Sequence, residues 1–133
     1  MQNKIKDRIK IRKEYAKIEN LECFPSKFNQ VILNILTNSI QAIEDQGEIL
    51  IQTIRSGIGV KIIIKDNGSG MSPEVKKHIF EPFFTTKEVG EGTGLGLSIS
   101  FGIIEQRNGN IDVISEPGKG TEFIIELPLF KED

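Results

Sequence analysis

The sequence predicts an α+β fold, a sandwich in which helices pack on an antiparallel sheet. Two observations support this prediction. Short apolar segments of strand length occur in pairs that are joined by glycine-containing turns. Two longer segments carry apolar side chains over helix-like lengths. The strand pairs are 48–55 with 60–65 and 111–115 with 121–127, and the two helices are 26–44 and 95–107.

A strand is also expected near the N-terminus, over residues 5 to 12. Isoleucines alternate there with basic side chains at a period of two, as in an edge strand with a solvated cationic face. The alternative is a basic arm that contacts nucleic acid, but we favour the strand and expect no nucleic-acid partner. A short apolar piece, Leu21 to Phe24, follows. The basic residues are Lys4, Lys6, Arg8, Lys10, Arg12, Lys13 and Lys17.

The segment that Pro25-Ser26 opens is expected to form a long helix to about Glu44. Apolar side chains cover most of the circumference of this helix, but one face carries carboxamide side chains at its centre. The ordinary reading is a solvated face, yet such faces usually favour Lys, Glu and Arg, and asparagine is a poor helix former. A carboxamide oxygen suits Mg²⁺, which prefers oxygen ligands. The polar positions are Gln30, Asn34, Asn38, Gln41 and Asp45.

A glycine turn, Asp66 to Met71, directly follows the apolar strand 60–65. Asn-Gly is typical of tight hairpin turns, but here Ser72-Pro73-Glu74 follows, which is a helix start with serine as the cap. An aspartate at the end of a buried strand can accept a hydrogen bond from an exocyclic amine, because an ionised carboxylate is an acceptor only. Adenine supplies such an amine, and guanine does so in a different place.

Residues 80 to 100 combine an aromatic anchor, a hydroxyl-rich turn with one lysine, and a glycine run that opens an apolar helix. Glycine allows close approach to a ligand, and the N–H groups at a helix start attract anions. This order predicts a hinged phosphate-binding lid; the alternative is a plain surface loop. A dinucleotide-binding fingerprint is excluded because no buried strand precedes the glycines, and a Walker loop lacks its upstream glycine. Asn108-Gly109 is expected to end the helix.

Composition is that of one soluble domain, residues 1–133. The chain is 38% hydrophobic and 27% charged, with a net charge of −2 and a single cysteine, Cys23. One cysteine cannot form an internal disulfide, which favours a reducing compartment. No segment has the length and apolar character of a membrane helix or a signal peptide. We therefore expect a cytoplasmic domain without membrane contact, whether or not a parent protein is membrane-bound.

Four segments together resemble the catalytic, ATP-binding domain of sensor histidine kinases, of the nitrogen-regulation and sporulation type. The resemblance covers nearly the whole chain, and the four boxes stand in the correct order. It implies the Bergerat-type fold shared with gyrase, mismatch-repair proteins and heat-shock chaperones: a two-layer α/β sandwich with a mixed, mostly antiparallel sheet covered on one face by about three helices. The segments are the N box, Gln30 to Ile43; the first glycine box, Asp66 to Met71; the F box, Ile79 to Lys87; and the second glycine box, Gly92 to Ser98.

The resemblance also implies roles for matching residues. Asn38, with Asn34 one helical turn earlier, would hold Mg²⁺ and the phosphates, so both are the implied metal ligands. Asp66 would accept a hydrogen bond from the adenine amine, and Thr121 would support Asp66 through water. Asn34 and Lys87 are the implied catalytic residues. The implied ATP-binding set is Asn34, Asn38, Gln41, Asp66, Gly68, Gly70, Met71, Thr85, Thr86, Lys87, Gly92, Thr93, Gly94, Leu95, Gly96, Leu97 and Thr121.

Glycines and the lid complete the implied site. Gly68 and Gly70 would let the base approach, and the backbone of Gly92 to Leu97 would wrap the phosphates. Phe80, Phe83 and Phe84 would anchor the near end of the lid. Many sensor kinases have a lysine or arginine where Gln41 stands, which leaves Lys87 as the only lid cation available to the γ-phosphate.

One position separates phosphotransfer from hydrolysis. Gyrase-like relatives have a glutamate, which activates water, four residues before the metal-binding asparagine; here that residue is Asn34. An amide cannot accept a proton at neutral pH, so transfer to a protein acceptor is favoured over hydrolysis. An ATPase module and an anti-sigma-type protein serine kinase remain the alternatives, with a non-nucleotide adaptor as an outside possibility.

The implied activity needs a histidine acceptor. The only histidine, His78, precedes Ile79-Phe80 instead of an acidic residue, and we expect it to be an ordinary surface or packing residue. The chain is then expected to be a catalytic domain without its phosphoacceptor. The implied partners are a histidine-bearing dimerisation domain and, through the parent kinase, a response-regulator receiver domain. The implied cofactors are ATP, with ADP as product, and Mg²⁺, and the isolated chain is expected to be a monomer.

Overall fold

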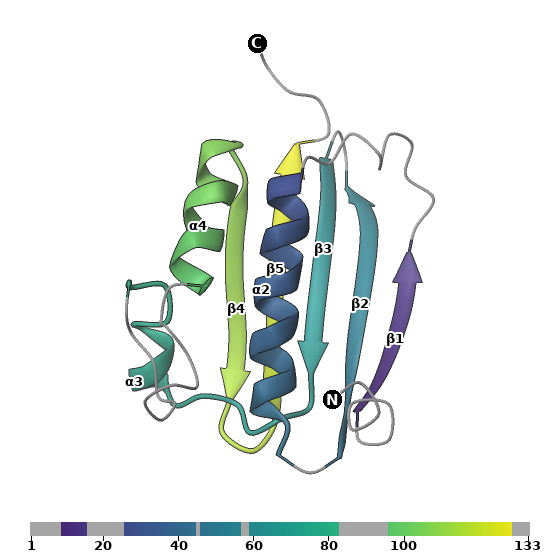
Figure 1. Cartoon of the computed structure of the whole chain (residues 1–133), viewed down its shortest axis with the longest axis vertical. Helices are drawn as coiled ribbons and strands as arrows, with labels where there is room; N and C mark the ends of the chain where they lie inside the picture. Colours follow the sequence, from purple (N-terminus) through teal and green to yellow (C-terminus); the bar gives the residue numbers. More distant parts are fainter. Residues whose placement is uncertain (1–8, 16–25, 45, 57–58, 83–95, 129–133) are drawn as a thin grey trace.

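The computed structural model describes residues 9–15, 26–44, 46–56, 59–82 and 96–128, and it confirms the predicted sandwich (Figure 1). Five strands form one sheet in the order β1-β2-β3-β5-β4. The first two strands are parallel and every other neighbouring pair is antiparallel, so the sheet is mixed and mostly antiparallel. The strands are β1 (Ile9–Tyr15), β2 (Gly47–Ser56), β3 (Gly59–Asp66), β4 (Asn110–Glu116) and β5 (Gly120–Pro128).

Three helices belong to the described part of the chain. They are α2 (Ser26–Ala42), α3 (Pro73–Lys76) and α4 (Gly96–Gln106). Figure 1 shows α2 in front of the sheet, α4 alongside β4, and α3 beside the end at which β3 and β4 finish. None of these helices is long and apolar enough to cross a bilayer.

Element boundaries follow the predictions closely. The expected strand at 5–12 is observed from Ile9 to Tyr15, and its expected first residues, 5–8, lie outside the described part. The long helix ends at Ala42, two residues before Glu44. Ser72 caps α3 as expected, because its side chain accepts a hydrogen bond from the Val75 N–H at 3.2 Å.

The core lies between the sheet and the helices. Side chains of β3 and β5 alternate, so every second residue faces α2 and is buried. On α2 a row of residues four apart faces the sheet, while Leu33, on the opposite side of the helix, is 64% exposed. The buried row consists of Val31, Ile35 and Ser39 on α2, and it continues with Ile43 directly after the helix.

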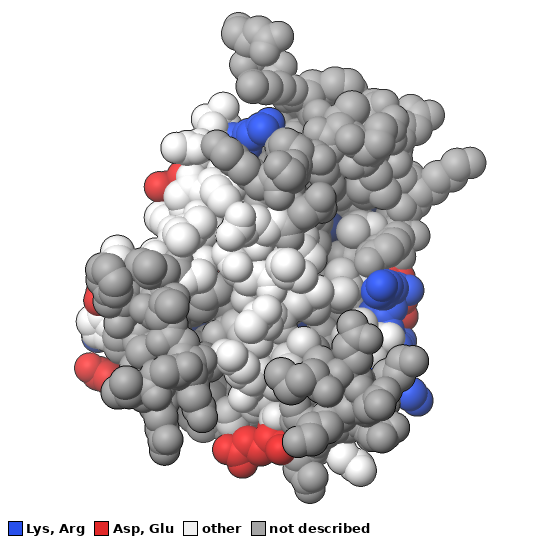
Figure 2. All heavy atoms as spheres, in the orientation of Figure 1, with Lys and Arg blue, Asp and Glu red and all other residues white. Residues whose placement is uncertain are grey.

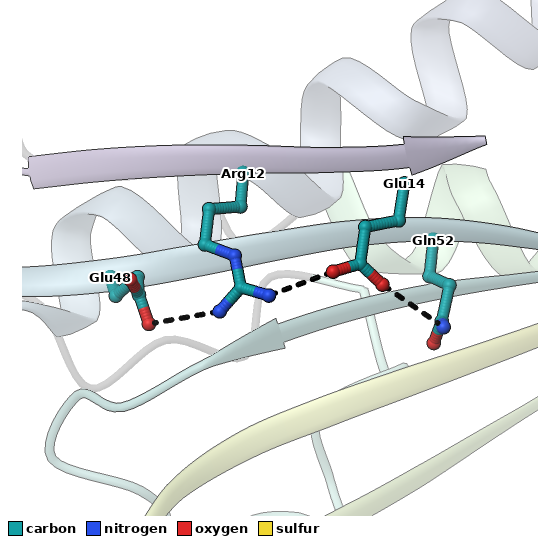
Figure 3. A network of polar contacts seen from close by, with 4 residues as sticks. All are labelled: Arg12, Glu14, Glu48 and Gln52. Atoms are coloured by element: carbon teal, nitrogen blue, oxygen red, sulfur yellow. Dashed lines mark hydrogen bonds and ion pairs between the residues drawn. The ribbon is translucent and has the colours of Figure 1, made fainter.

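Charged side chains lie on the other face of the sheet, together with exposed isoleucines such as Ile54 and Ile114. Figure 3 shows Arg12 of β1 between two carboxylates: it donates to Glu14 at 2.7 Å and forms an ion pair with Glu48 at 3.8 Å. Gln52 donates to the other oxygen of Glu14 at 3.4 Å. These exposed pairs stabilise little, but the Arg12 guanidinium has acidic partners in its own sheet. This arrangement supports the edge-strand interpretation for β1.

Candidate nucleotide-binding site

Asp66 is the last residue of β3 and is 2% exposed. Its alternation with Ile64 and Ile62 places it on the helix-covered face. One carboxylate oxygen, Oδ1, accepts a hydrogen bond from the Gly68 N–H at 2.8 Å. The other, Oδ2, is buried and has no hydrogen-bond partner among the described residues. A buried acceptor without a partner is what recognition of an amine would require.

Burial raises the pKa of Asp66, because desolvation penalises the charged carboxylate. Three groups oppose this rise by favouring the charged form: the N–H of Gly68, the hydroxyl of Ser39 and the backbone of Thr121. The Ser39 hydroxyl does so although its position falls outside ordinary hydrogen-bond geometry. Asp66 is therefore a tightly enclosed carboxyl group with a free acceptor atom.

The turn that follows Asp66 is held by hydrogen bonds to three neighbouring elements. On the α2 side, the Ser69 N–H donates to the carbonyl of Ala42 at 3.0 Å. On the β2 side, Asn67 Oδ1 accepts from the Glu48 N–H at 2.8 Å. On the β4–β5 side, the Gly118 N–H donates to the Ser69 carbonyl at 2.7 Å. Contacts to α2, β2 and the β4–β5 turn together fix this glycine box in place.

Ser115 of β4 links the same turn to β5, and the sequence interpretation did not include it. Its Oγ accepts a hydrogen bond from the Met71 N–H at 2.8 Å and lies 3.0 Å from the Gly120 carbonyl, to which it can donate. It is also hydrogen-bonded to Thr121 Oγ1 at 2.8 Å, and either hydroxyl of this pair could be the donor. Thr121 pairs with Asp66 across the β3–β5 ladder. Ser115 thus links the predicted residues Met71 and Thr121, and Thr121 in turn lies opposite Asp66.

Close backbone packing explains two of the predicted glycines. A Cβ added at Gly68 would lie 2.6 Å from the Ala42 carbonyl oxygen, and one added at Gly70 would lie 1.9 Å from that of Glu116. Gly70 also has a φ of +74°, which side-chain-bearing residues rarely adopt. The protein's own backbone therefore requires both glycines, and approach of a base to them stays a prediction.

The N box and the second glycine box meet at Asn34. Its Nδ2 donates to the Gly96 carbonyl at 3.1 Å and to Ser100 Oγ at 3.2 Å, which ties the middle of α2 to the start of α4. Because the Gly96 carbonyl only accepts, the amide nitrogen faces α4 and the amide oxygen faces elsewhere. Ser100 was also missed by the sequence interpretation. Its hydroxyl donates to Gly96 four residues earlier, a pattern that α-helices accommodate.

Asn38 lies one turn after Asn34 on α2 and, like it, is half-buried, while Gln41 is exposed. The described residues contain no cluster of three or more His, Cys, Asp or Glu that could hold a metal ion. Carboxamide oxygens remain as protein ligands, and they fit Mg²⁺, which often takes few protein groups and completes its shell with water and phosphate oxygens. The oriented oxygen of Asn34 fits this chemistry.

The surface around these residues carries little charge. Figure 2 shows that the described surface over α2 is uncharged, with Lys, Arg, Asp and Glu at its margins. Gly96 and Leu97 are the first two residues of α4, half-buried. The remaining predicted lid residues lie outside the described part: Thr85, Thr86, Lys87, Gly92, Thr93, Gly94 and Leu95.

His78 lies after α3, where its Nδ1 is 2.6 Å from Glu81 Oε2. The His78 side chain is 40% exposed. This geometry is that of a surface residue with a local partner, as expected. Nothing in it resembles a phosphoacceptor on a long dimerisation helix.

Comparison with known proteins identifies the class first. The family model described as "Histidine kinase-, DNA gyrase B-, and HSP90-like ATPase" matches residues 24–131, so the chain belongs to this family of ATP-binding domains. The predicted resemblance is thereby confirmed at the level of the family.

Within this family the relatives are sensor histidine kinases. The chain is 43% identical over 112 residues to sensor histidine kinase ZraS of Escherichia coli (strain K12), a match that covers 84% of the chain and 24% of ZraS. It is 46% identical over 114 residues to sporulation kinase E of Bacillus subtilis (strain 168), with 84% and 15% covered. The chain thus spans about a quarter or less of the length of these relatives.

Solved structures give the same result. The catalytic domain of histidine kinase ThkA superposes with a TM-score of 0.78 at 33% identity, over 96% of this chain and 84% of that one. Full-length ShkA in complex with AMPPNP superposes with a TM-score of 0.77 at 27% identity, over 93% of this chain and 26% of that one. The chain is therefore homologous to catalytic domains of sensor histidine kinases.

Proposed function

We propose that this domain binds Mg²⁺-ATP and donates the γ-phosphate to a histidine on a separate dimerisation domain. The observation that carries the proposal is the contact of Asn34 with Gly96, which joins the carboxamide face of α2 to the start of α4. The buried acceptor of Asp66 lies at the end of β3, under the same helix. An amine acceptor, oxygen ligands for Mg²⁺ and a helix start for phosphate together suit ATP.

Each group has a proposed part in binding. Asp66 accepts a hydrogen bond from the adenine amine, and Thr121 supports the carboxylate. The carbonyl oxygens of Asn34 and Asn38 hold Mg²⁺, which would neutralise charge on the phosphates. The N–H groups at the start of α4, at Gly96 and Leu97, face the phosphates, together with the lid residues that precede them.

Transfer is favoured over hydrolysis by the chemistry of Asn34. Its amide nitrogen donates to α4, and an amide has no proton affinity at neutral pH, so it cannot activate water. Phosphoryl transfer depends mainly on positioning and charge stabilisation, and the acceptor's own domain can supply the base. The parent kinase would supply this acceptor and the route to a receiver domain. The AMPPNP-bound relative supports the nucleotide part of the proposal.

Calorimetry and labelled phosphate test the two halves of this proposal. The domain is expected to bind ATP in the presence of Mg²⁺, and to label a histidine-bearing dimerisation domain added in trans but not itself. Labelled product should be lost in acid, since phosphohistidine is acid-labile and phosphoserine is not. Acid-stable product would indicate the serine-kinase alternative, and rapid ATP turnover without an acceptor would indicate the ATPase alternative. Absence of binding at millimolar nucleotide would contradict all three.

Lys87→Ala is expected to reduce the rate of phosphotransfer in trans by about 100-fold, because it removes the one proposed lid cation that stabilises charge on the γ-phosphate. ATP affinity should change by less than about threefold, since the lysine contributes mainly in the transition state. Single-turnover kinetics and calorimetry measure the two quantities. Lys119→Ala, at an exposed turn, is the matched charge control. Unchanged phosphotransfer in the Lys87 variant would show that another group stabilises the γ-phosphate.

A further inference from the structure

The face of the sheet opposite α2, called the open face below, is apolar at its centre. An antiparallel sheet with one face in water usually carries polar side chains on that face. Here β3 and β5 place Ile63 and Ile124 opposite each other in the middle of the open face, and both are half-buried. On the same face Ile114 of β4 is 56% exposed and Ile54 of β2 is 37% exposed. Covering these side chains with a second protein surface would be favourable.

Charged residues flank the two central isoleucines in matched pairs. Lys65 lies opposite Glu122 in the β3–β5 ladder on one side of them, and Lys61 lies opposite Glu126 on the other side. None of these four side chains forms an ion pair or a hydrogen bond within the part of the chain that the structure describes. Both lysines belong to β3 and both glutamates belong to β5. The open face therefore has a positive row beside a negative row, each interrupted by an isoleucine.

The two rows complement the same two rows of a second copy of the sheet. A twofold axis that runs between β3 and β5, parallel to them, places β3 of each copy over β5 of the other and keeps the register. Lys65 then lies over the second copy's Glu122, and Lys61 lies over its Glu126. The isoleucines meet between these charges. The strands of the two sheets are aligned in this arrangement, as they are in β-sandwiches.

The flanking strands fit the same arrangement. The rotation brings β2 of one copy over β4 of the other, so Leu50 faces Ile114. Both belong to the ladder row that also contains Lys65 and Glu122. A twofold axis across the strands would instead place Lys65 over Lys61, and these like charges would repel each other. Of the two face-to-face arrangements, only the one with its axis along the strands is complementary.

We propose that the open face is an interaction surface for a second copy of this domain, with the twofold axis between β3 and β5. At ordinary strand spacings this part of the four strands buries about 800 Å² over both copies, less than stable complexes bury. The pairing is therefore weak, with a dissociation constant of roughly 0.1 mM, and it is compatible with a monomer at micromolar concentration. Two copies joined through a dimerisation domain would reach an effective concentration of about 1 mM and pair. The candidate nucleotide-binding site lies on the helix-covered face and stays accessible.

Charge reversal on facing residues tests this pairing. Sedimentation equilibrium of the whole chain from about 10 μM to 1 mM should show a monomer–dimer equilibrium. Lys65→Glu sets glutamates against glutamates and Glu122→Lys sets lysines against lysines, so each variant alone should associate at least about 30-fold more weakly. An equimolar mixture of the two variants should regain the affinity of the unmodified chain within about threefold, because opposite charges face each other again in the mixed pair.

Recovery in the mixture can come only from contact between chains, since neither variant regains a ladder partner of opposite charge in its own sheet. Lys61→Glu and Glu126→Lys form a second, independent pair with the same expected result. Lys77→Glu is the matched control, because Lys77 is an exposed lysine directly after α3 and outside the sheet. It should associate as the unmodified chain does, and urea unfolding should show that every variant is folded.

Three outcomes would overturn the proposal. The first is an unmodified chain that stays monomeric at 1 mM, which would assign the open face to solvent or to a different partner. The second is association of the single variants with the affinity of the unmodified chain. The third is weakened association that the mixture does not restore, because the charge reversal would then act within each chain and not between chains.

Discussion

Asp66→Asn is expected to weaken ATP binding by about 100-fold, the size of a lost charge-assisted hydrogen bond in a buried site. The Gly68 N–H donates to Asp66 Oδ1, and in the variant it should hold the amide oxygen in that place. The amide NH₂ then takes the position of Oδ2 and presents donors to the adenine amine, which is itself a donor. Calorimetry with ATP and Mg²⁺ measures the loss.

The same substitution should not weaken the fold. Burial raises the pKa of Asp66, so the folded protein binds a proton at this carboxyl more tightly than the unfolded chain does. The favourable contribution of the protonated group is fully present below the unfolded-state pKa and is lost as pH rises through the folded-state pKa. At neutral pH the buried charge therefore opposes folding, and the uncharged amide should leave the free energy of unfolding unchanged or higher.

Urea unfolding at pH 7, beside calorimetry, separates the two effects. Asp112→Asn, on the exposed side of β4, is the control and should alter neither quantity. A clear loss of stability in the Asp66 variant would mean that the charged carboxylate stabilises the fold. Retained ATP affinity would mean that Asp66 does not bind the amine. Loss of binding with retained stability would assign Asp66 to recognition.

The fold was largely predictable because its strands pair locally. Residues 48–55 and 60–65 alternate on either side of a short turn, and both strands are found with one extra residue at each end. The parallel pairing of β1 with β2 joins segments that are far apart in the sequence. The pattern of β1 identifies a strand but not its neighbour, so the mixed character of the sheet followed only from the family resemblance.

The sequence singled out candidate site residues that have a distinctive side chain, but not the small hydroxyls that contact them. Asn34 and Asp66 stand out by type and position. In the structure Asn34 of α2 is hydrogen-bonded to the start of α4, and Asp66 lies at the end of β3. Ser100 and Ser115 act through hydrogen bonds to other segments. Such contacts leave no pattern along the chain, because a serine is common in loops, helices and strands alike.

Gly70→Ala is expected to have the largest effect on stability, lowering the free energy of unfolding by about 3 kcal/mol or more. Its φ of +74° disfavours any side chain, and the added Cβ would lie 1.9 Å from the Glu116 carbonyl oxygen and 3.2 Å from that of Gly120. Both obstacles are backbone atoms, so no side chain can rotate away. The β4–β5 turn would have to separate from the glycine box that follows Asp66.

Gly118→Ala isolates the steric part of this effect. Gly118 has a nearly equal φ of +79°, but an added Cβ would meet nothing within 4 Å, so only the backbone strain of about 1–2 kcal/mol should appear. Urea unfolding measures the free energy of unfolding of each variant. The difference between the two values is the free energy needed to separate the β4–β5 turn from the glycine box. Near-equal stabilities would show that the two turns separate freely. A large difference, accompanied by weaker ADP binding only in Gly70→Ala, would show that contact with the β4–β5 turn holds Asp66 in its binding position.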